Sequence, residues 1–169
     1  VGGFLISLNI TDVRHFMSQL LVGDTFKSLY LSEADITTGI SYTINGNINR
    51  SFYTDEEFSE LKDTTYTRWG NVQSLCFEII KGKKVPSSMK IVFLLPDEDV
   101  NSIINADDIN ISPSDINGLF INIRYTNGTL NLVTGSSLKI FSMDKSIDRS
   151  FDSYVRGFLD EADIAYEEM

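Results

Sequence analysis

The sequence predicts a single α+β domain, residues 1–169, built on one mixed or antiparallel sheet with two β-hairpins and about five helices. Three observations predict this class: apolar stripes with helical spacing, short apolar runs with strand character, and a sequence with no Pro-rich or Ser/Gly-rich linker. Of the 169 residues, 42% are hydrophobic and 22% are charged, which is typical of a globular interior. This composition excludes a disordered tail, a coiled coil and a collagen-like chain.

Apolar residues recur at i, i+3, i+4 and i+7 in three segments, which predicts amphipathic helices there. The segments are residues 13–21, 72–80 and 151–162. Gly23 and Gly82 follow the first two stripes and provide helix stops.

Two shorter helices are expected from the chemistry of their first turns. Thr54 and Glu57 match the reciprocal capping box, which predicts a helix at residues 55–61. Three acidic residues at 97–99 place negative charge at the positive end of a helix dipole, which predicts a helix at residues 98–105.

Strands are expected between these helices. Residues 89–95 form an almost unbroken apolar run, which predicts an interior strand buried on both faces. Residues 138–142 predict another strand. The element order is β-α-β-β-α-α and then β-α-β-β-β-α, which suggests two structural halves, residues 1–87 and 88–169, within one continuous sheet.

The second hairpin has a clear predicted register. Asn127-Gly128 is a favoured two-residue turn after the alternating segment 119–126. It sets Tyr125 opposite Leu130 and Ile123 opposite Leu132, so the apolar faces match.

The first hairpin is expected at Asn45-Gly46. A two-residue loop would oppose Ile44 to Asn47, which is a poor match. A three-residue loop, residues 45–47, opposes Ile44 to Ile48 and Ile40 to Phe52. Because a one-residue slip exchanges the two faces, we expect the three-residue loop.

The net charge of −10 is unevenly distributed. Residues 1–92 carry 9 basic and 10 acidic side chains, whereas residues 93–169 carry 5 basic and 14 acidic ones. Such acidity disfavours nonspecific binding to nucleic acid or to anionic lipid. The sequence also has no apolar run of about 18 residues. We therefore expect no nucleic-acid partner and no membrane association.

The single cysteine and the single histidine limit the chemistry available. One cysteine cannot form an internal disulfide, which fits a cytoplasmic location. Cys76 lies in an apolar stripe and is expected to be a buried, inert thiol. His15 lies opposite the stripe of its helix and is expected to be an ordinary surface residue. Since phosphate-loop and triad motifs are also missing, we predict no catalytic residue, no metal and no cofactor.

The basic residues suggest one candidate anion site. Lysines cluster after the expected helix at 72–80, and two cations on expected strands would have to join them. This set comprises Lys81, Lys83, Lys84, Arg124 and Lys139. The favoured alternative is structural, because lysines near a helix C-terminus complement its dipole.

Two classes of function follow. The favoured one is a non-enzymatic binding or protein-interaction module, with either a protein partner or self-association through an exposed strand edge. The alternative is a small enzyme or ligand-binding protein that acts on an anionic small molecule.

A resemblance to a known family is carried by the segments FMSQLLVGDTF, CFEIIKGKKVPSSMKIVFLLP and NGLFINIRYTNG, followed by TGSSLKIFSMDKS. These resemble a small family from Gram-positive Firmicutes that is catalogued only as a domain of unknown function. The resemblance spans most of the chain, and its KGKK and SLKIF parts are moderately specific. It implies a bacterial, cytoplasmic, single-domain protein of about this length, and it brings no activity.

The repeated strand-helix-hairpin order also loosely resembles the halves of DNA sliding-clamp domains. Clamps need Lys and Arg on the helices that face DNA. The expected helix at 98–105 contains neither, so the resemblance does not extend to a DNA role.

Overall fold

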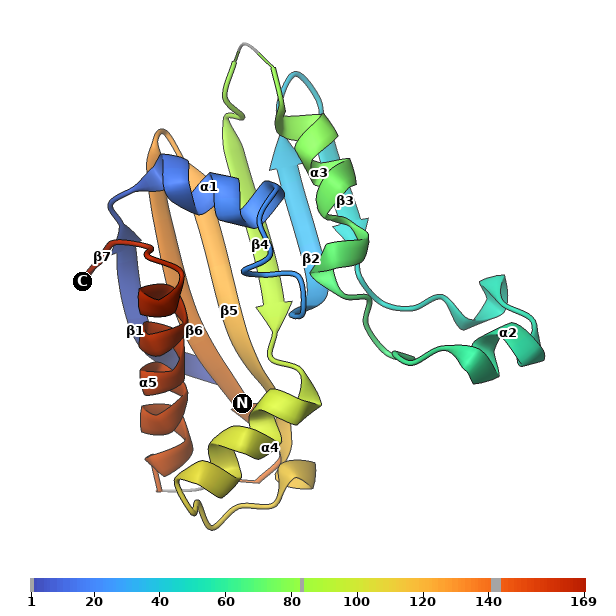
Figure 1. Ribbon diagram of the computed structural model, residues 1–169, viewed down its shortest axis with the longest axis vertical. Helices are drawn as coiled ribbons and strands as arrows, with labels where there is room; N and C mark the ends of the chain where they lie inside the picture. Colours follow the sequence, from blue (N-terminus) through green and yellow to red (C-terminus); the bar gives the residue numbers. More distant parts are fainter. Residues whose placement is uncertain (1, 83, 141–143) are drawn as a thin grey trace.

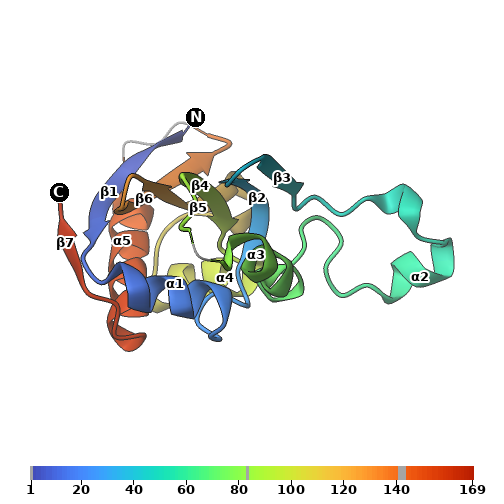
Figure 2. The same ribbon diagram turned by 90° about the horizontal axis from the view of Figure 1, so that it is seen from above.

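The computed structural model describes residues 2–82, 84–140 and 144–169. These residues form one seven-stranded sheet in which neighbouring strands are antiparallel, with four helices packed against one face (Figure 1; Figure 2). The predicted α+β class is therefore confirmed.

The strands are β1 (Gly2–Ile10), β2 (Tyr30–Thr37), β3 (Ser41–Asn45), β4 (Ser88–Leu94), β5 (Ile116–Thr126), β6 (Thr129–Leu138) and β7 (Tyr166–Glu168). Their order across the sheet is β3-β2-β4-β5-β6-β1-β7. Strand β1 of the first predicted half thus lies between β6 and β7 of the second.

The helices are α1 (Val13–Leu21), α2 (Asp55–Glu60), α3 (Gln73–Ile80), α4 (Asp97–Ala106) and α5 (Ser146–Glu161), with 3₁₀ turns at Arg50–Phe52, Trp69–Asn71 and Pro113–Asp115. Helices α1, α3, α4 and α5 lie on one side of the sheet, and α2 projects away from the body (Figure 2). None of the described helices combines the length and the apolar character needed to cross a membrane.

The core lies between the helices and the sheet, and aromatic rings fill its centre. The ring centroid of Phe26 lies 5.2 Å from that of Phe16 and 5.8 Å from that of Phe93. Trp69 is fully buried and packs edge-on against Phe93, at 5.3 Å between centroids. Its indole N–H donates a 2.7 Å hydrogen bond to the carbonyl oxygen of Leu20, so its polar group is satisfied.

The predicted register of the second hairpin is confirmed. Tyr125 lies opposite Leu130 and Ile123 lies opposite Leu132. Asn127 and Gly128 have φ angles of 52° and 81°, the left-handed conformations that a tight turn of this kind requires.

The predicted first hairpin is wrong. Strand β3 pairs back onto β2, so Ile44 faces Ala34, and the chain turns at residues 38–40. Gly46 is not part of the turn. It allows the backbone to pass close to Leu31, because a Cβ at position 46 would lie 1.8 Å from the carbonyl oxygen of Leu31. At this position the glycine of the Asn-Gly pair is required by close packing and not by a turn.

Two further features differ from expectation at the C-terminal side. Strand β6 runs unbroken to Leu138, and Lys139 and Ile140 form a bend, so no strand begins at 138; residues 141–142 lie outside the described residues. The short strand β7 was not predicted, and it adds to the outer side of β1.

Candidate functional site

A projecting arm, residues 47–66, connects β3 to the Trp69 turn. It extends away from the body and carries α2 (Figure 1). At its base, the Ile48 N–H donates to the Thr65 carbonyl at 2.8 Å and the Thr67 N–H donates to the Gly46 carbonyl at 2.9 Å. The two ends of the arm are thus held together beside the sheet.

The arm is held in shape by its own contacts. The Thr54 hydroxyl accepts from the Glu57 N–H at 3.1 Å, and the Glu57 carboxylate accepts from the Thr54 N–H at 2.9 Å, so the predicted capping box is confirmed. These bonds hold the pKa of the Glu57 carboxyl below its usual range. The Arg50 guanidinium pairs with Asp55 and lies 4.2 Å from the centroid of the Phe58 ring.

The arm exposes an aromatic surface. Neither α2 nor the Arg50–Phe52 turn contains a buried residue. Phe52 is 78% exposed, and its ring lies edge-on to that of Tyr53 at 5.3 Å between centroids. This aromatic cluster, in which Phe52 is exposed and Tyr53 is half-buried, lies on a folded projection and offers a surface that another molecule can cover.

Arg68 joins the returning end of the arm to the body. Its Nε and Nη2 atoms donate to the two carboxylate oxygens of Asp63 at 3.0 and 2.9 Å. Its Nη1 atom donates to Glu98 at 2.9 Å and to the Ser28 carbonyl at 2.8 Å, and the guanidinium lies 4.5 Å from the centroid of the Tyr30 ring. The hydrogen bonds from Arg68 hold the pKa of the Asp63 carboxyl below its usual range.

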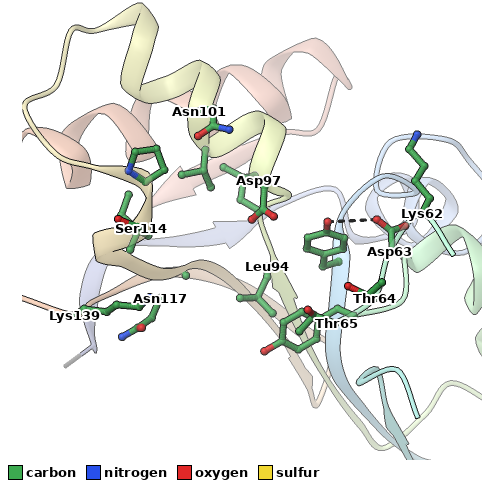
Figure 3. A pocket seen from close by; sticks show the side chains of 17 residues that line it. Lys62, Asp63, Thr64, Thr65, Leu94, Asp97, Asn101, Ser114, Asn117 and Lys139 are labelled. Atoms are coloured by element: carbon green, nitrogen blue, oxygen red, sulfur yellow. Dashed lines mark hydrogen bonds between the residues drawn. The ribbon is translucent and has the colours of Figure 1, made fainter. Parts of the chain in front are cut away.

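A pocket of about 620 Å³ lies at the base of the arm, between the end of β4, the start of α4 and the Pro113–Asp115 turn (Figure 3). The polar residues that line it come from separate parts of the chain: Lys62, Asp63, Thr64, Thr65, Asp97, Asn101, Ser114, Asn117 and Lys139. Apolar residues from the end of β4, the connection after it and α4 complete the wall, among them Leu94, Leu95 and Val100.

The pocket is lined by charged side chains of both signs and by hydrogen-bonding groups. Lys139 and Lys62 lie on opposite sides of it, with the Asp97 carboxylate between them (Figure 3). The Asp63 carboxylate is engaged by Arg68, as described above. Among the described residues, no three His, Cys, Asp or Glu side chains are grouped so that they could hold a metal ion. The arrangement is suited to binding a polar molecule.

The predicted lysine cluster follows α3. Lys81 forms an ion pair with Glu78 one turn earlier in the helix, and Lys84 is exposed in the following loop. Lys83 lies outside the described residues. The pairing of Lys81 fits the structural interpretation of these lysines.

The other two predicted cations lie far apart. Arg124 lies on β5 beside the start of β4, opposite Lys90. Its partner on β6 is Asn131, and Lys139 follows eight residues later along the chain. At about 3.3 Å per residue, this places Lys139 roughly 26 Å from Arg124. Among the four described members of the predicted set, Lys139 is the one that lines the pocket.

The cysteine and the histidine, the two side chains with the greatest catalytic potential, make structural contacts in the fold. Cys76 is fully buried, as predicted, and burial raises the pKa of its thiol to about 11. The prediction for His15 is wrong. Its ring is half-buried, and its Nε2 atom lies 2.9 Å from the carbonyl oxygen of Ala162 because the segment after α5 folds back over α1.

Sequence reasoning missed most of the pocket. Lys62 stands alone in the sequence, and Asp97 fits the helix-dipole interpretation equally well. No local spacing joins them to Ser114 or Asn117, because tertiary packing brings these segments together.

The fold and the site define the class as an antiparallel α+β domain with a projecting arm and a polar pocket at its base. A family described as being of unknown function, DUF5721, matches residues 19–167, and the chain belongs to this family. Comparisons with curated proteins and with solved structures gave no match.

Proposed function

We propose that this chain is a non-enzymatic protein-interaction module whose arm carries the binding surface. The observation that carries the proposal is the 78% exposure of Phe52 on a segment that is folded yet buries none of the residues of its helical turns. Fully burying a phenylalanine side chain contributes about 1.5–3 kcal/mol, so a partner that covers Phe52 gains a substantial share of binding free energy.

The arm is also organised before any partner arrives. Its capping box and its Arg50 contacts fix the backbone around the aromatic cluster. A preformed surface loses less conformational entropy on binding than a disordered one. Aromatic and arginine side chains are the types most enriched at interface centres.

A photo-crosslinking amino acid at position 52, in protein produced in its native cells, tests this proposal. We expect one discrete covalent adduct that contains this chain and a protein partner. The matched control carries the same amino acid at Thr126, an exposed residue on β5 outside the arm, and should give none. No adduct at position 52, or equal adducts at both positions, would overturn the proposal.

The pocket supports a second candidate function, the binding of an anionic small molecule. Lys62 and Lys139 lining one cavity of about 620 Å³ favour it. A thermal-shift screen of nucleotides, sugar phosphates and carboxylates should find a ligand that raises the melting temperature. Lys139→Gln should abolish that shift, and the exposed control Lys84→Gln should retain it. No shift at millimolar concentrations removes this candidate.

We also propose a bacterial cytoplasmic setting. The single cysteine is buried and cannot form an internal disulfide, which suits a reducing compartment. The quoted sequence segments support the bacterial assignment through their resemblance to the Firmicutes family.

A further inference from the structure

We propose that the partner of the arm is a second copy of this chain, and that the two copies join by two-fold antiparallel pairing of strand β3. This inference rests on the proposed function, because it identifies what covers the arm. Three observations lead to it: a free sheet edge, the residues on that edge, and the position of the arm beside it.

Strand β3 is an edge whose outer side pairs with no other strand of the described residues. The Gly46 N–H donates to the Ser32 carbonyl, and the Thr38 N–H donates to the carbonyl of Ile40. Since hydrogen bonding alternates along antiparallel strands, the even-numbered residues of β3 direct their N–H and C=O groups toward β2. The outward backbone groups belong to Ser41, Thr43 and Asn45.

This edge lacks the usual protection. Strand β3 reads Ser-Tyr-Thr-Ile-Asn, with no charge and no proline. Natural edge strands are commonly protected by charged residues, by proline or by extreme shortness. The opposite edge shows such protection, because β7 has three residues, of which Glu167 and Glu168 are exposed acids.

Two copies of β3 can pair with each other as antiparallel strands, because the side chains that this pairing sets opposite one another are compatible. A two-fold axis at Thr43 sets Tyr42 opposite Ile44 of the second copy, and Ser41 opposite Asn45. Aromatic pairs with β-branched residues are among the stabilising cross-strand pairs. Two-fold pairing at this axis places Thr43 against itself, which an uncharged residue permits and a charged one would oppose. Because Thr43 directs its backbone groups outward, the two copies of Thr43 exchange both hydrogen bonds.

The same pairing brings the arm onto the second copy. The arm begins just after Asn45 and extends beyond the β3 edge (Figure 2). Asn45 lies beside Ser41 of the second copy, which follows Ile40, a side chain that is 64% exposed. The Ser87 N–H donates to the Thr37 carbonyl at 2.9 Å, so the loop that contains Lys84 lies near that turn.

The facing surfaces complement each other in charge and in polarity. The arm carries the acidic side chains Asp55, Glu56, Glu57 and Glu60 together with the exposed Phe52. The turn and the loop of the second copy present exposed apolar and basic side chains: Ile40, Val85 (76% exposed), Lys81 and Lys84. An acidic aromatic arm therefore meets a basic apolar end, once on each side of the two-fold axis.

Opposite charges at the axis give the sharpest test. Sedimentation velocity of the full chain across micromolar concentrations should show a dimer. Thr43→Lys and Thr43→Glu should each weaken the dimer, because each sets two like charges against one another across the axis. The loss should be larger for Thr43→Glu, because the Asp35 carboxylate lies opposite position 43 on β2 and accepts a 2.8 Å hydrogen bond from the Thr43 hydroxyl. An equimolar mixture of the two variants should recover the dimer through a Lys-Glu pair. The control Thr126→Lys, which changes an exposed strand residue away from the edge, should remain dimeric.

A covalent test avoids any dependence on charge. Directly opposed strand residues have Cα atoms about 5.5 Å apart when hydrogen-bonded, which a disulfide can span. Thr43→Cys should therefore form a disulfide-linked dimer under mild oxidation, whereas Thr126→Cys should not, and the buried Cys76 does not compete.

The outcomes separate this inference from the proposed function. A wild-type chain that stays monomeric across the concentration range overturns the β3 dimer. An adduct of residue 52 with a different protein would then still support the interaction module. A dimer that is not weakened in either charged Thr43 variant also overturns the β3 dimer. Circular dichroism of each variant should match that of the wild type, so that loss of folding is recognised.

Discussion

The body and the arm are stabilised in different ways. The body buries large aromatic side chains completely between the helices and the sheet, as Phe26 and Trp69 show. The arm keeps its shape through a capping box and a cation-π contact, and its helical turns bury no residue. This difference indicates that the free energy of folding comes mainly from the body, so that the arm can present a surface.

The same substitution in both regions gives the largest expected contrast. Phe26→Ala removes a fully buried ring that contacts Phe16, Phe93 and Phe158, and should lower the free energy of unfolding by about 3–5 kcal/mol. Phe52→Ala should change it by no more than about 0.5 kcal/mol. Urea denaturation of the two variants measures both values. Equal losses would show that the arm belongs to the folding core.

Arg68 tests the junction between the two regions and has an intermediate expected effect. Arg68→Met leaves the Asp63 carboxylate without its bidentate partner and removes the bond to Glu98. We expect a loss of about 1–3 kcal/mol in the free energy of unfolding. Hydrogen exchange of residues 46–67 should also quicken. The exposed control Arg124→Met should change neither quantity, and unchanged exchange in Arg68→Met would contradict the anchoring role.

The pH dependence of that loss follows from Asp63. Arg68 lowers the pKa of the Asp63 carboxyl in the folded state, so the ionised form is the one that it stabilises. The contribution is fully present above the unfolded pKa of about 3.9 and disappears as the pH falls through the folded value. The stability difference between wild type and Arg68→Met should therefore be constant near neutral pH and shrink below about pH 4. A difference that grows on acidification contradicts this origin.

The sequence predicts the body better than the arm, because the spacing of apolar residues indicates which faces are buried, and the body contains the buried faces. The stripes of α1 and α3 and the register of Ile123 opposite Leu132 all follow from apolar faces that must match. The same assumption is wrong at the first hairpin, where it predicts Ile40 opposite Phe52. In the structure both side chains are exposed, and only tertiary packing against Leu31 explains the glycine at position 46.

The residues of the candidate pocket could not be grouped from the sequence, for a similar reason. Lys139 is one of the predicted cations, but the prediction groups it with Arg124, which lies near the opposite end of strands β5 and β6. Its neighbours in the pocket, Lys62 and Asp97, become neighbours only when the arm returns beside the start of α4. Whether these residues lie close together depends on the order of the strands in the sheet, and pairing preferences within one hairpin do not determine that order.

The smallest expected effect concerns the arm alone. Thr54→Ala removes the side-chain acceptor of the capping box, which should cost helix α2 about 1 kcal/mol. A six-residue helix without a cap and without buried residues is marginal, so its amides should exchange faster. Global unfolding should stay within about 0.5 kcal/mol of wild type, because the body does not depend on α2. Thr54→Ser keeps the hydroxyl and should keep the slow exchange. If Thr54→Ala instead destabilised the whole chain, the arm would contribute to folding, and its exposed Phe52 could no longer be assigned to binding alone.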